Sequence, residues 1–287
     1  MANLHYARIG DVWKHLPLAE VLAIERPGSY WESHAGSSSH PLTRSPERDY
    51  GVFLFLERAV RSSVLEDSAY RRLLYPRERG TTPPTYPGSP LIAMELLGGA
   101  GGRFVFCDLD GASLANIAED ARALGGPSGC VRLVQENGVS TLEEELARLT
   151  EEEAAETFLH VDPYRPLEPG RGGQTPLGLF ARAAERGVGC MLWYGFDARG
   201  TRAVVLEALR ERIAGGAWYG EVSLRAEDLS EVGFDAGVLG CGVVMCNVGR
   251  VATGACSRLG EGLAHAYAGA RLPNGHDGAL KFEEGTF

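Results

Sequence analysis

The segment Phe158-Leu159-His160-Val161-Asp162-Pro163-Tyr164 combines an apolar run with an acid, a proline and an aromatic residue, and the predicted fold is built around it. Its first four residues are mostly apolar, which is typical of a strand buried in a parallel sheet. Pro163 has no N–H group to donate to a neighbouring strand, so the strand is expected to end before it. Asp162 and Tyr164 are therefore expected at the carboxyl end of a strand, where open α/β sheets bind their ligands.

These residues suit a site that holds a planar amine. The Asp162 carboxylate and the Pro163 carbonyl can each accept a hydrogen bond from an amino group, and the Tyr164 ring offers a flat surface. We therefore predict Asp162 and Tyr164 as catalytic residues and Pro163 as a substrate-binding residue. The alternative is an Asp-Pro turn that only ends a strand. His160 shares a strand face with Asp162 and is either a proton acceptor or a core histidine.

Helical and strand patterns alternate along the rest of the chain. Helices are expected at residues 11–25, 111–124, 141–156, 175–186 and 201–214, the first of them with Asp11 as its N-cap. Strands are expected at residues 28–32, 103–108, 131–134, 189–194, 218–224 and 237–248. This alternation predicts an α/β fold in which a mostly parallel sheet lies between two layers of helices, that is, a three-layer Rossmann-like sheet.

Residues 41–85 interrupt the pattern with helical stretches and form the most basic part of the chain. We interpret them as an inserted helical subdomain whose arginines are either solvated or turned toward the substrate. Residues 1–40 and 86–270 would then form one Rossmann-like domain. Residues 271–287 are polar and rich in glycine, so we expect a C-terminal tail there.

The composition limits the partners that we expect. The net charge is −10 over 287 residues, whereas proteins that grip nucleic acid usually carry a basic surplus, so a large RNA partner is disfavoured. No apolar run reaches the ~18 residues of a membrane span, and the first residues lack a signal-peptide pattern, so we expect a cytoplasmic protein that contacts no membrane. The six cysteines form no CxxC pair, so we expect neither a metal site nor disulfides.

Polar residues follow three successive predicted strands: Asp108, Asn137 and Asp162. An acid after the second strand of such a unit typically binds ribose hydroxyls, which is the role predicted for Asp108. Asn137 can hydrogen-bond an adenine edge, and Asp162 then faces the reacting group. The small-residue loop at 33–40 either lets backbone amides approach a ligand closely or is a surface turn. This layout predicts a nucleoside cofactor lying across the strand ends.

Five ordered segments resemble the bacterial large-subunit (23S) rRNA adenine N-methyltransferases, which use S-adenosylmethionine. The segments are Asp11-Val12-Trp13-Lys14-His15, Glu32-Ser33-His34-Ala35-Gly36, Tyr86-Pro87-Gly88-Ser89-Pro90-Leu91-Ile92-Ala93, Asp162-Pro163-Tyr164 and Leu192-Trp193-Tyr194. The third segment matches the family's YPGSPLIA segment in full. The helical insertion also occupies the same place in the chain as it does in that family.

The resemblance implies a class I methyltransferase fold with S-adenosylmethionine as its cofactor. It implies that six residues surround this cofactor: Lys14, His34, Gly36, Ser89, Asp108 and Asn137. It also implies that Asp162 is catalytic and that Tyr6 faces the acceptor. Trp193 would form the far side of the acceptor pocket or belong to the core.

The sequence departs from the family at the substrate surfaces. Its motif has one proline in place of two, its loop reads Gly36-Ser37-Ser38 in place of Gly-x-Gly, and its N-terminal segment is shorter. We therefore expect an S-adenosylmethionine-dependent methyltransferase that acts on an amine nitrogen of a nucleobase or a small molecule. The alternatives are a natural-product tailoring enzyme, including one redirected to other chemistry, and a homologue that needs a protein partner.

Overall fold

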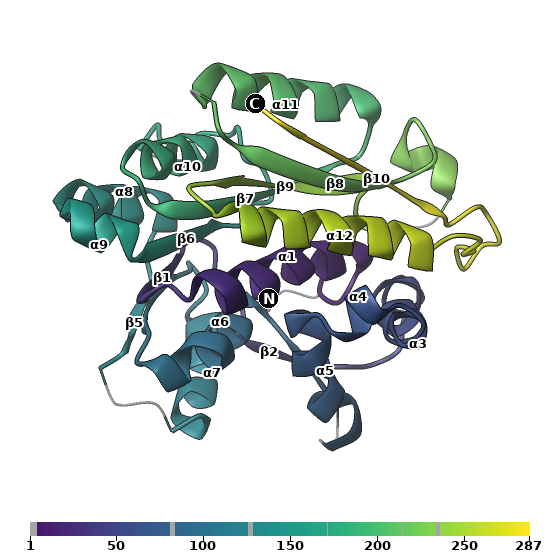
Figure 1. Cartoon of the computed structure of the whole chain (residues 1–287), viewed down its shortest axis with the longest axis horizontal. Helices are drawn as coiled ribbons and strands as arrows, with labels where there is room; N and C mark the ends of the chain where they lie inside the picture. The colour runs from purple at the N-terminus through teal and green to yellow at the C-terminus, as the bar shows by residue number, and fades with distance from the viewer. Residues whose placement is uncertain (1–4, 81–83, 126–128, 171, 214, 234–235) are drawn as a thin grey trace.

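The computed structural model describes residues 5–80, 84–125, 129–170, 172–213, 215–233 and 236–287. Within these residues, eight strands form one sheet in the order β10-β8-β9-β7-β6-β1-β4-β5 (Figure 1). Their bounds are β1 Ser29–Glu32, β4 Arg103–Cys107, β5 Val131–Val134, β6 Thr157–Val161, β7 Gly189–Phe196, β8 Trp218–Leu224, β9 Gly240–Cys246 and β10 Leu280–Thr286. Strands β5, β4, β1, β6 and β7 are parallel, whereas β9 and β10 run antiparallel to their neighbours.

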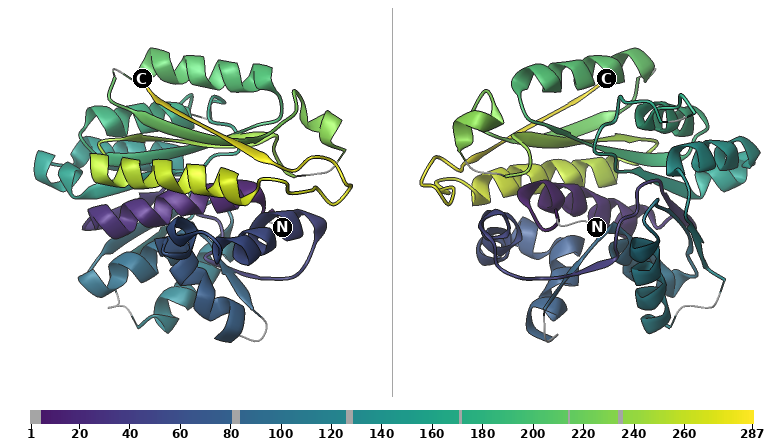
Figure 2. Two further views of the ribbon diagram at one scale, coloured as in Figure 1. Left: turned by 45° about the vertical axis from the view of Figure 1, so that its right-hand side comes forward. Right: turned by 180° about the vertical axis from the view of Figure 1, so that it is seen from behind.

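Helices cover both faces of this sheet (Figures 1 and 2). One face carries α1 Ile9–Glu25, α6 Ser89–Leu97, α7 Gly111–Ala123 and α12 Arg250–Ala266. The other face carries α8 Gly138–Arg148, α10 Pro176–Glu185 and α11 Arg199–Arg212, with the short α9 Glu151–Ala155 beside them. The predicted three-layer Rossmann-like α/β fold is therefore confirmed.

The strand order reverses at β1, and this reversal positions the site. β1 lies between β4 and β6, so the chain first winds outward through β4 and β5 and then returns to the other side of β1. Glu32, the last residue of β1, pairs with Phe106 on one side and with His160 on the other. Asp108 and Asp162 each come two residues after these partners, so they flank a topological switch point.

The inserted segment is helical, as expected. It contains α2 Pro46–Arg48, the π-helical turn Asp49–Phe53, α3 Leu54–Ala59, α4 Ser63–Glu66 and α5 Ala69–Gly80. These elements stand between β2 Ser39–Pro41 and β3 Thr85–Pro87, which form a separate antiparallel pair. They pack against α1 and α12 and lie beside the main sheet's helical layer, as Figure 2 shows. The division of the chain into domains stays a prediction.

The C-terminal part of the chain differs from the sequence-based expectation. The helix α12 was not predicted, because its glycines and scattered polar residues weaken the helical pattern. Residues 271–287 do not form only a tail, because β10 pairs with β8 along its whole length and completes the sheet. Successive side chains of β10 point to opposite faces of the sheet, as expected of a strand. Phe282 packs on Trp13 with ring centroids 5.4 Å apart, whereas the neighbouring Lys281 is exposed.

Two helix boundaries also differ. α1 begins at Ile9, and Asp11 is not its N-cap, although a carboxylate oxygen of Asp11 accepts a hydrogen bond from the Arg8 amide. The single helix expected at 141–156 is split, because Thr150 and Glu153 form a new capping box that starts α9. Among the described residues, no helix is both long enough and apolar enough to cross a membrane.

Candidate active site

A cavity of about 260 Å³ lies at the carboxyl ends of β1, β4 and β6. Predicted site residues from distant parts of the chain line it: Tyr6, Lys14, His34, Gly36, Ser89, Asp108, Asp162 and Tyr164. A second cavity of about 350 Å³ adjoins it and is lined by Pro163 and Trp193 among others. Hereafter these are the first cavity and the second cavity. Pro163 and Trp193 thus line only the second cavity, whereas most of the residues predicted to bind the cofactor line the first.

Lys14 and Asp162 lie where the two cavities meet, because both residues line both cavities. Lys14 Nζ donates to Asp162 Oδ2 at 2.7 Å and lies 3.2 Å from Asp11 Oδ1. Burial by itself raises the pKa of Asp162, but the nearby positive charges, first of all Lys14, hold it below its ordinary value. Burial lowers the pKa of Lys14, but Asp162 and Asp11 outweigh this effect and raise it. Both side chains of the pair are therefore charged at neutral pH.

Asp108 and Gly36 are joined by a hydrogen bond across the mouth of the first cavity. The Gly36 amide donates to Asp108 Oδ2 at 2.8 Å, and the Asp110 amide donates to Asp108 Oδ1 at 2.8 Å. Gly36 has φ +61°, a conformation that favours glycine. Each carboxylate oxygen of Asp108 keeps further lone-pair capacity, so this carboxylate can still accept hydroxyl groups of a ligand.

His34 and His15 present imidazoles to the first cavity. His34 Nδ1 lies 2.8 Å from Ser33 Oγ, and burial lowers the pKa of His34. His15 was not predicted as a site residue, although it stands directly after Lys14 in the motif. Its Nδ1 lies 2.9 Å from the Tyr86 hydroxyl, which itself accepts a hydrogen bond from Tyr70.

The protonation of His15 follows from its burial. Burial lowers the pKa of His15 well below its ordinary value, so the ring is neutral at pH 7. Its Nδ1 either accepts a hydrogen bond from the Tyr86 hydroxyl or donates one to it, according to the tautomer. Its Nε2 is buried and has no hydrogen-bond partner within the described chain. A buried nitrogen without a partner is costly, and a polar ligand atom would remove that cost.

Ser89 belongs to a buried polar network below the first cavity. Its hydroxyl donates to Glu32 Oε1 at 2.5 Å, and His160 Nδ1 lies 2.9 Å from the same oxygen. Tyr30 donates to Glu32 Oε2 at 3.1 Å. Glu32 and His160 are both fully buried. The sequence signal of this network was a polar residue within each of two apolar strands, and only the strand register shows that Glu32 and His160 are paired.

Glu32, His160 and Asp162 each bring one possible metal-ligand atom within 4.8 Å of the others. The donor types would suit a divalent cation. In this structure Glu32 holds Ser89 and His160 Nδ1, and Asp162 holds the Lys14 ammonium, whereas His160 Nε2 has no hydrogen-bond partner among the described residues. The trio fits a hydrogen-bonded network better than a metal centre, since the ammonium already neutralises Asp162.

Four predicted residues need separate description. Asn137 does not line either cavity, and its Oδ1 caps α8 by accepting hydrogen bonds from the Val139 and Ser140 amides. Tyr164 is 78% exposed, so it borders the cavities without being enclosed. Tyr6 stacks on the His40 ring and lies against the Arg48 guanidinium. Trp193 is half-buried, and the Lys14 ammonium lies 5.7 Å from its ring centroid.

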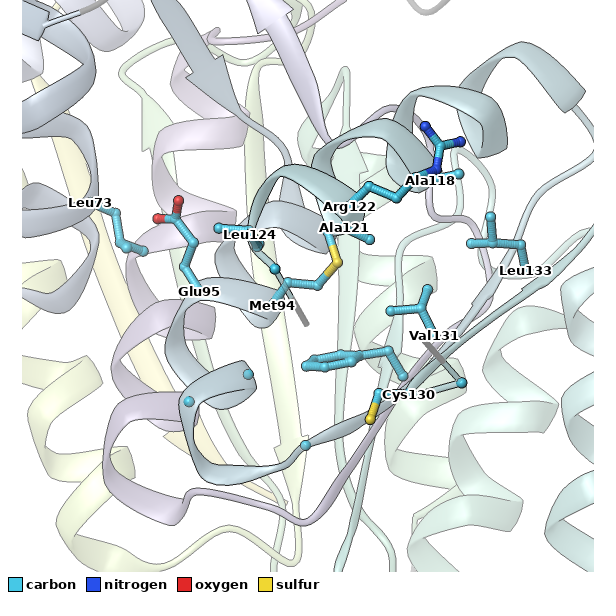
Figure 3. A pocket seen from close by; sticks show the side chains of 16 residues that line it. Leu73, Met94, Glu95, Ala118, Ala121, Arg122, Leu124, Cys130, Val131 and Leu133 are labelled. Carbon is cyan, nitrogen blue, oxygen red and sulfur yellow. The ribbon is translucent and has the colours of Figure 1, made fainter. Parts of the chain in front are cut away.

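A larger hollow of about 770 Å³ lies elsewhere, between α6, α7 and the amino ends of β4 and β5 (Figure 3). Its walls are mostly apolar, with Met94, Phe104 and Val131 among them, and it contains no predicted site residue. The titratable side chains Glu95 and Arg122 lie at its border. The first and second cavities are therefore the candidate site because charged groups converge on them, although the apolar hollow is larger.

No family model and no curated protein matches this sequence. Among solved structures, the crystal structure of protein LPL1258 from Legionella pneumophila, described with the family model DUF519, is similar over 98% of both chains, with 20% identity and a TM-score of 0.74. An S-adenosylmethionine-dependent methyltransferase from Agrobacterium tumefaciens is 15% identical over 82% of this chain and 59% of that chain, with a TM-score of 0.40. An rRNA methylase from Streptococcus thermophilus is 10% identical over 85% of this chain and 99% of that chain, with a TM-score of 0.38. The Legionella protein shows a shared fold along the whole chain.

Proposed function

We propose that this protein is an S-adenosylmethionine-dependent methyltransferase that acts on an amine nitrogen. One observation carries the proposal: the charged pair Lys14–Asp162 lies between two adjoining cavities at the switch point of the sheet. A transferase needs this arrangement, because a donor and an acceptor must approach one reacting centre from two sides. The resemblance of the motifs to rRNA adenine N-methyltransferases supports the same class.

The first cavity fits the cofactor by its chemistry. Asp108 supplies a carboxylate for ribose hydroxyls, and the loop at Gly36 brings backbone close to the ligand. Lys14 is a donor for a carboxylate group, and the unpaired Nε2 of His15 is a further polar atom of the same cavity lining. When bound, S-adenosylmethionine supplies a methyl group that is already activated by its sulfonium.

Asp162 would act on the acceptor. Lys14 holds Oδ2, and no hydrogen bond to Oδ1 occurs in the described parts of the chain, so Oδ1 is the oxygen offered to an amine. Its negative charge would stabilise the positive charge that develops on the amine nitrogen as this atom gains a methyl group. The surplus proton of the methylated nitrogen can then move to Asp162 and on to water. Pro163 and Trp193 would orient the acceptor from the second cavity.

A small-molecule acceptor, as in a natural-product tailoring enzyme, is the second candidate. The second cavity favours it, because the positive charges of Arg8 and Lys14 are balanced there by Asp11 and Asp162. A site for a polynucleotide usually shows a surplus of basic residues. A nucleobase within RNA is therefore the less favoured acceptor.

Calorimetric titration with S-adenosylmethionine and S-adenosylhomocysteine tests the cofactor. We expect micromolar binding that is lost in Asp108→Ala and retained in the matched variant Asp110→Ala, since Asp110 lies outside both cavities. The absence of binding at millimolar ligand would contradict the proposal. Transfer of a radiolabelled methyl group to adenosine, to total RNA and to a panel of aromatic amines would then separate the acceptor classes.

A further inference from the structure

Two cysteines lie opposite each other on adjacent strands of the sheet. β7 pairs in parallel with β6 and antiparallel with β9. Cys190, the second residue of β7, is the register partner of Cys246, the last residue of β9. Neither residue lines the first or the second cavity. About 56 positions separate the two residues in the chain, so a search for CxxC spacing does not find the pair.

The strand geometry suits a disulfide between these two cysteines. Residues directly opposite each other in an antiparallel pair have Cα atoms about 4.5–5.5 Å apart, with their side chains on the same face. Disulfides join residues whose Cα atoms are about 4.4–6.8 Å apart, so both kinds of antiparallel pairing fall within this range. Both thiols are free and buried in this structure. A bond between them therefore requires no separation of the strands.

The chain around the pair keeps the two cysteines in register. The Cys190 thiol lies 3.9 Å from the Phe180 carbonyl of α10, so the pair lies beneath this helix (Figure 1). Asn247, directly after Cys246, has φ +54°, a conformation that asparagine tolerates better than most residues. Its side-chain amide donates to one carbonyl in the last turn of α10 and to the carbonyl just before β7, at 2.9 and 3.0 Å. These bonds fasten the end of β9 to the start of β7.

The two thiols differ in reactivity. A hydrogen bond with Cys190 lowers the pKa of Cys246, although burial opposes this effect. Burial raises the pKa of Cys190 well above its ordinary value. Cys246 is 5% exposed at the end of its strand, whereas Cys190 is 0% exposed. Because the thiolate is the nucleophile, Cys246 is the thiol that reacts first with an oxidant, and Cys190 is the thiol that resolves the product.

We propose that Cys190 and Cys246 form a reversible oxidation site, at which hydrogen peroxide links β7 to β9 through a disulfide. The Cys246 thiolate attacks one peroxide oxygen, the O–O bond breaks, and a sulfenic acid and hydroxide result. The Cys190 sulfur then attacks the sulfenic sulfur, the S–O bond breaks, and the departing hydroxide takes up the thiol proton as water. The two thiols thus give two electrons to one peroxide. Two molecules of a small thiol reverse the step by exchange and leave as their own disulfide.

The disulfide would join the two parts of the sheet covalently. It would hold β7, which carries Trp193 of the second cavity farther along, to the strand that pairs with β8. It would also close a loop of about 56 residues in the unfolded chain, which lowers the entropy of that state. We therefore expect the midpoint of thermal unfolding, Tm, to rise by about 5 °C on oxidation. The site does not depend on which cofactor the first cavity binds.

Treatment of the folded protein with hydrogen peroxide, followed by alkylation, trypsin digestion and mass spectrometry, tests the site. The expected product is a disulfide between the peptide of Cys190 and the peptide that contains both Cys241 and Cys246. Cys241→Ala is the matched control, because Cys241 is buried on the same strand but has Val222 and Gly195 as its register partners. This variant should form the link as the wild type does, whereas Cys246→Ala should form none.

All proteins in this comparison carry Cys130→Ser, because Cys130 is more exposed than the other five cysteines and would otherwise link two molecules. In Cys190→Ala, the oxidation of Cys246 should stop at the sulfenic acid, which dimedone traps. The absence of the link at millimolar peroxide in the wild-type pair would overturn the site. A link that still forms in Cys246→Ala would also overturn it, because Cys241 would then be the partner.

Thermal unfolding gives a second readout that needs no digestion. The Tm of the protein with both cysteines should rise by about 5 °C after peroxide and return after dithiothreitol. Neither Cys190→Ala nor Cys246→Ala should show this reversible rise, whereas Cys241→Ala should show it. A reversible rise of the same size in Cys190→Ala or Cys246→Ala would overturn the site, because the change would then come from other groups.

Discussion

The Lys14 ammonium lies 2.7 Å from Asp162 Oδ2, although 148 residues separate them in the chain. Their side chains are only 12% and 15% exposed. The pair joins the first turns of α1 to the end of β6, and thereby joins the N-terminal helix to the strand that ends in the Asp-Pro-Tyr motif. It therefore contributes both to the fold and to the proposed chemistry.

Lys14→Met should destabilise the protein by about 3 kcal/mol, because it leaves a mostly buried carboxylate without its counter-ion. The chain offers a matched control in Lys281→Met. Lys281 is 55% exposed and pairs with Glu283, so its loss should cost less than about 1 kcal/mol. Urea denaturation of both variants measures the difference. Equal costs would show that the Lys14–Asp162 pair is not shielded from solvent.

The stability of the wild type should depend on pH through Asp162. The pKa of Asp162 is lowered in the folded state, so the unfolded chain binds the proton more readily. The stabilisation is complete above the unfolded pKa of about 3.9 and is lost as the pH falls through the folded value. Lys14 has a raised pKa, so its contribution is lost only above about pH 10.5.

Denaturation curves of the wild type and Asp162→Asn between pH 3 and pH 7 test whether the stabilisation by Asp162 is lost toward acidic pH. The difference between their free energies of unfolding should be large at pH 7 and should shrink below about pH 4. Asp110→Asn serves as a comparison, because hydrogen bonds from Ser113 and Ala112 lower the pKa of this exposed carboxyl without any contact with Lys14, so a smaller change of the same sign is expected there. If the difference in the free energy of unfolding between the wild type and Asp162→Asn grew as the pH falls, the lowered pKa of Asp162 would be contradicted.

Ser89→Ala should cost about 2 kcal/mol, because it removes a hydroxyl donor from a fully buried carboxylate, that of Glu32. Ser37→Ala is a suitable comparison. Its hydroxyl makes a 3.2 Å bond to another hydroxyl, that of Ser113, so the expected cost is about 0.5 kcal/mol. Thermal unfolding of both variants decides whether the Glu32 network is as tightly paired as its distances indicate.

Gly138→Ala should be among the most damaging small changes in the chain. A Cβ at this position would lie 2.0 Å from the Ser33 carbonyl oxygen, so α8 would have to move away from the loop after β1. We expect a loss above about 3 kcal/mol and weaker binding of S-adenosylhomocysteine. Gly200→Ala, in α11 with no atom within 4 Å of the added carbon, should instead stabilise by up to about 1 kcal/mol. Similar values for the two variants would show that the loop yields to the added carbon.

The fold class could be predicted from the sequence alone, and the sequence also indicated the strand ends at which the candidate site is proposed. Local periodicity was enough to predict the strands before Asp108 and Asp162, because the sequence pattern of an apolar strand followed by an acid does not depend on what the strand packs against. The end of β6 followed from Pro163, whose missing N–H is a property of one residue. Local periodicity did not predict α12, because its glycines weaken the helical pattern. It did not predict β10 either, because this segment is held as a strand by its hydrogen bonds to β8.

The contacts between polar groups of distant segments could be read only from the tertiary structure. Lys14 with Asp162, Glu32 with His160, and Tyr6 with His40 and Arg48 are pairs between distant segments. No periodic pattern encodes such pairs, because they depend on strand register and on how helices and loops pack. The sequence correctly predicted that Asn137 follows a strand, but it did not predict the partners of its side chain. Asn137 Oδ1 accepts hydrogen bonds from the first turn of α8 and thereby caps this helix. Position along the chain follows from local chemistry, whereas the partner of a polar group follows from packing.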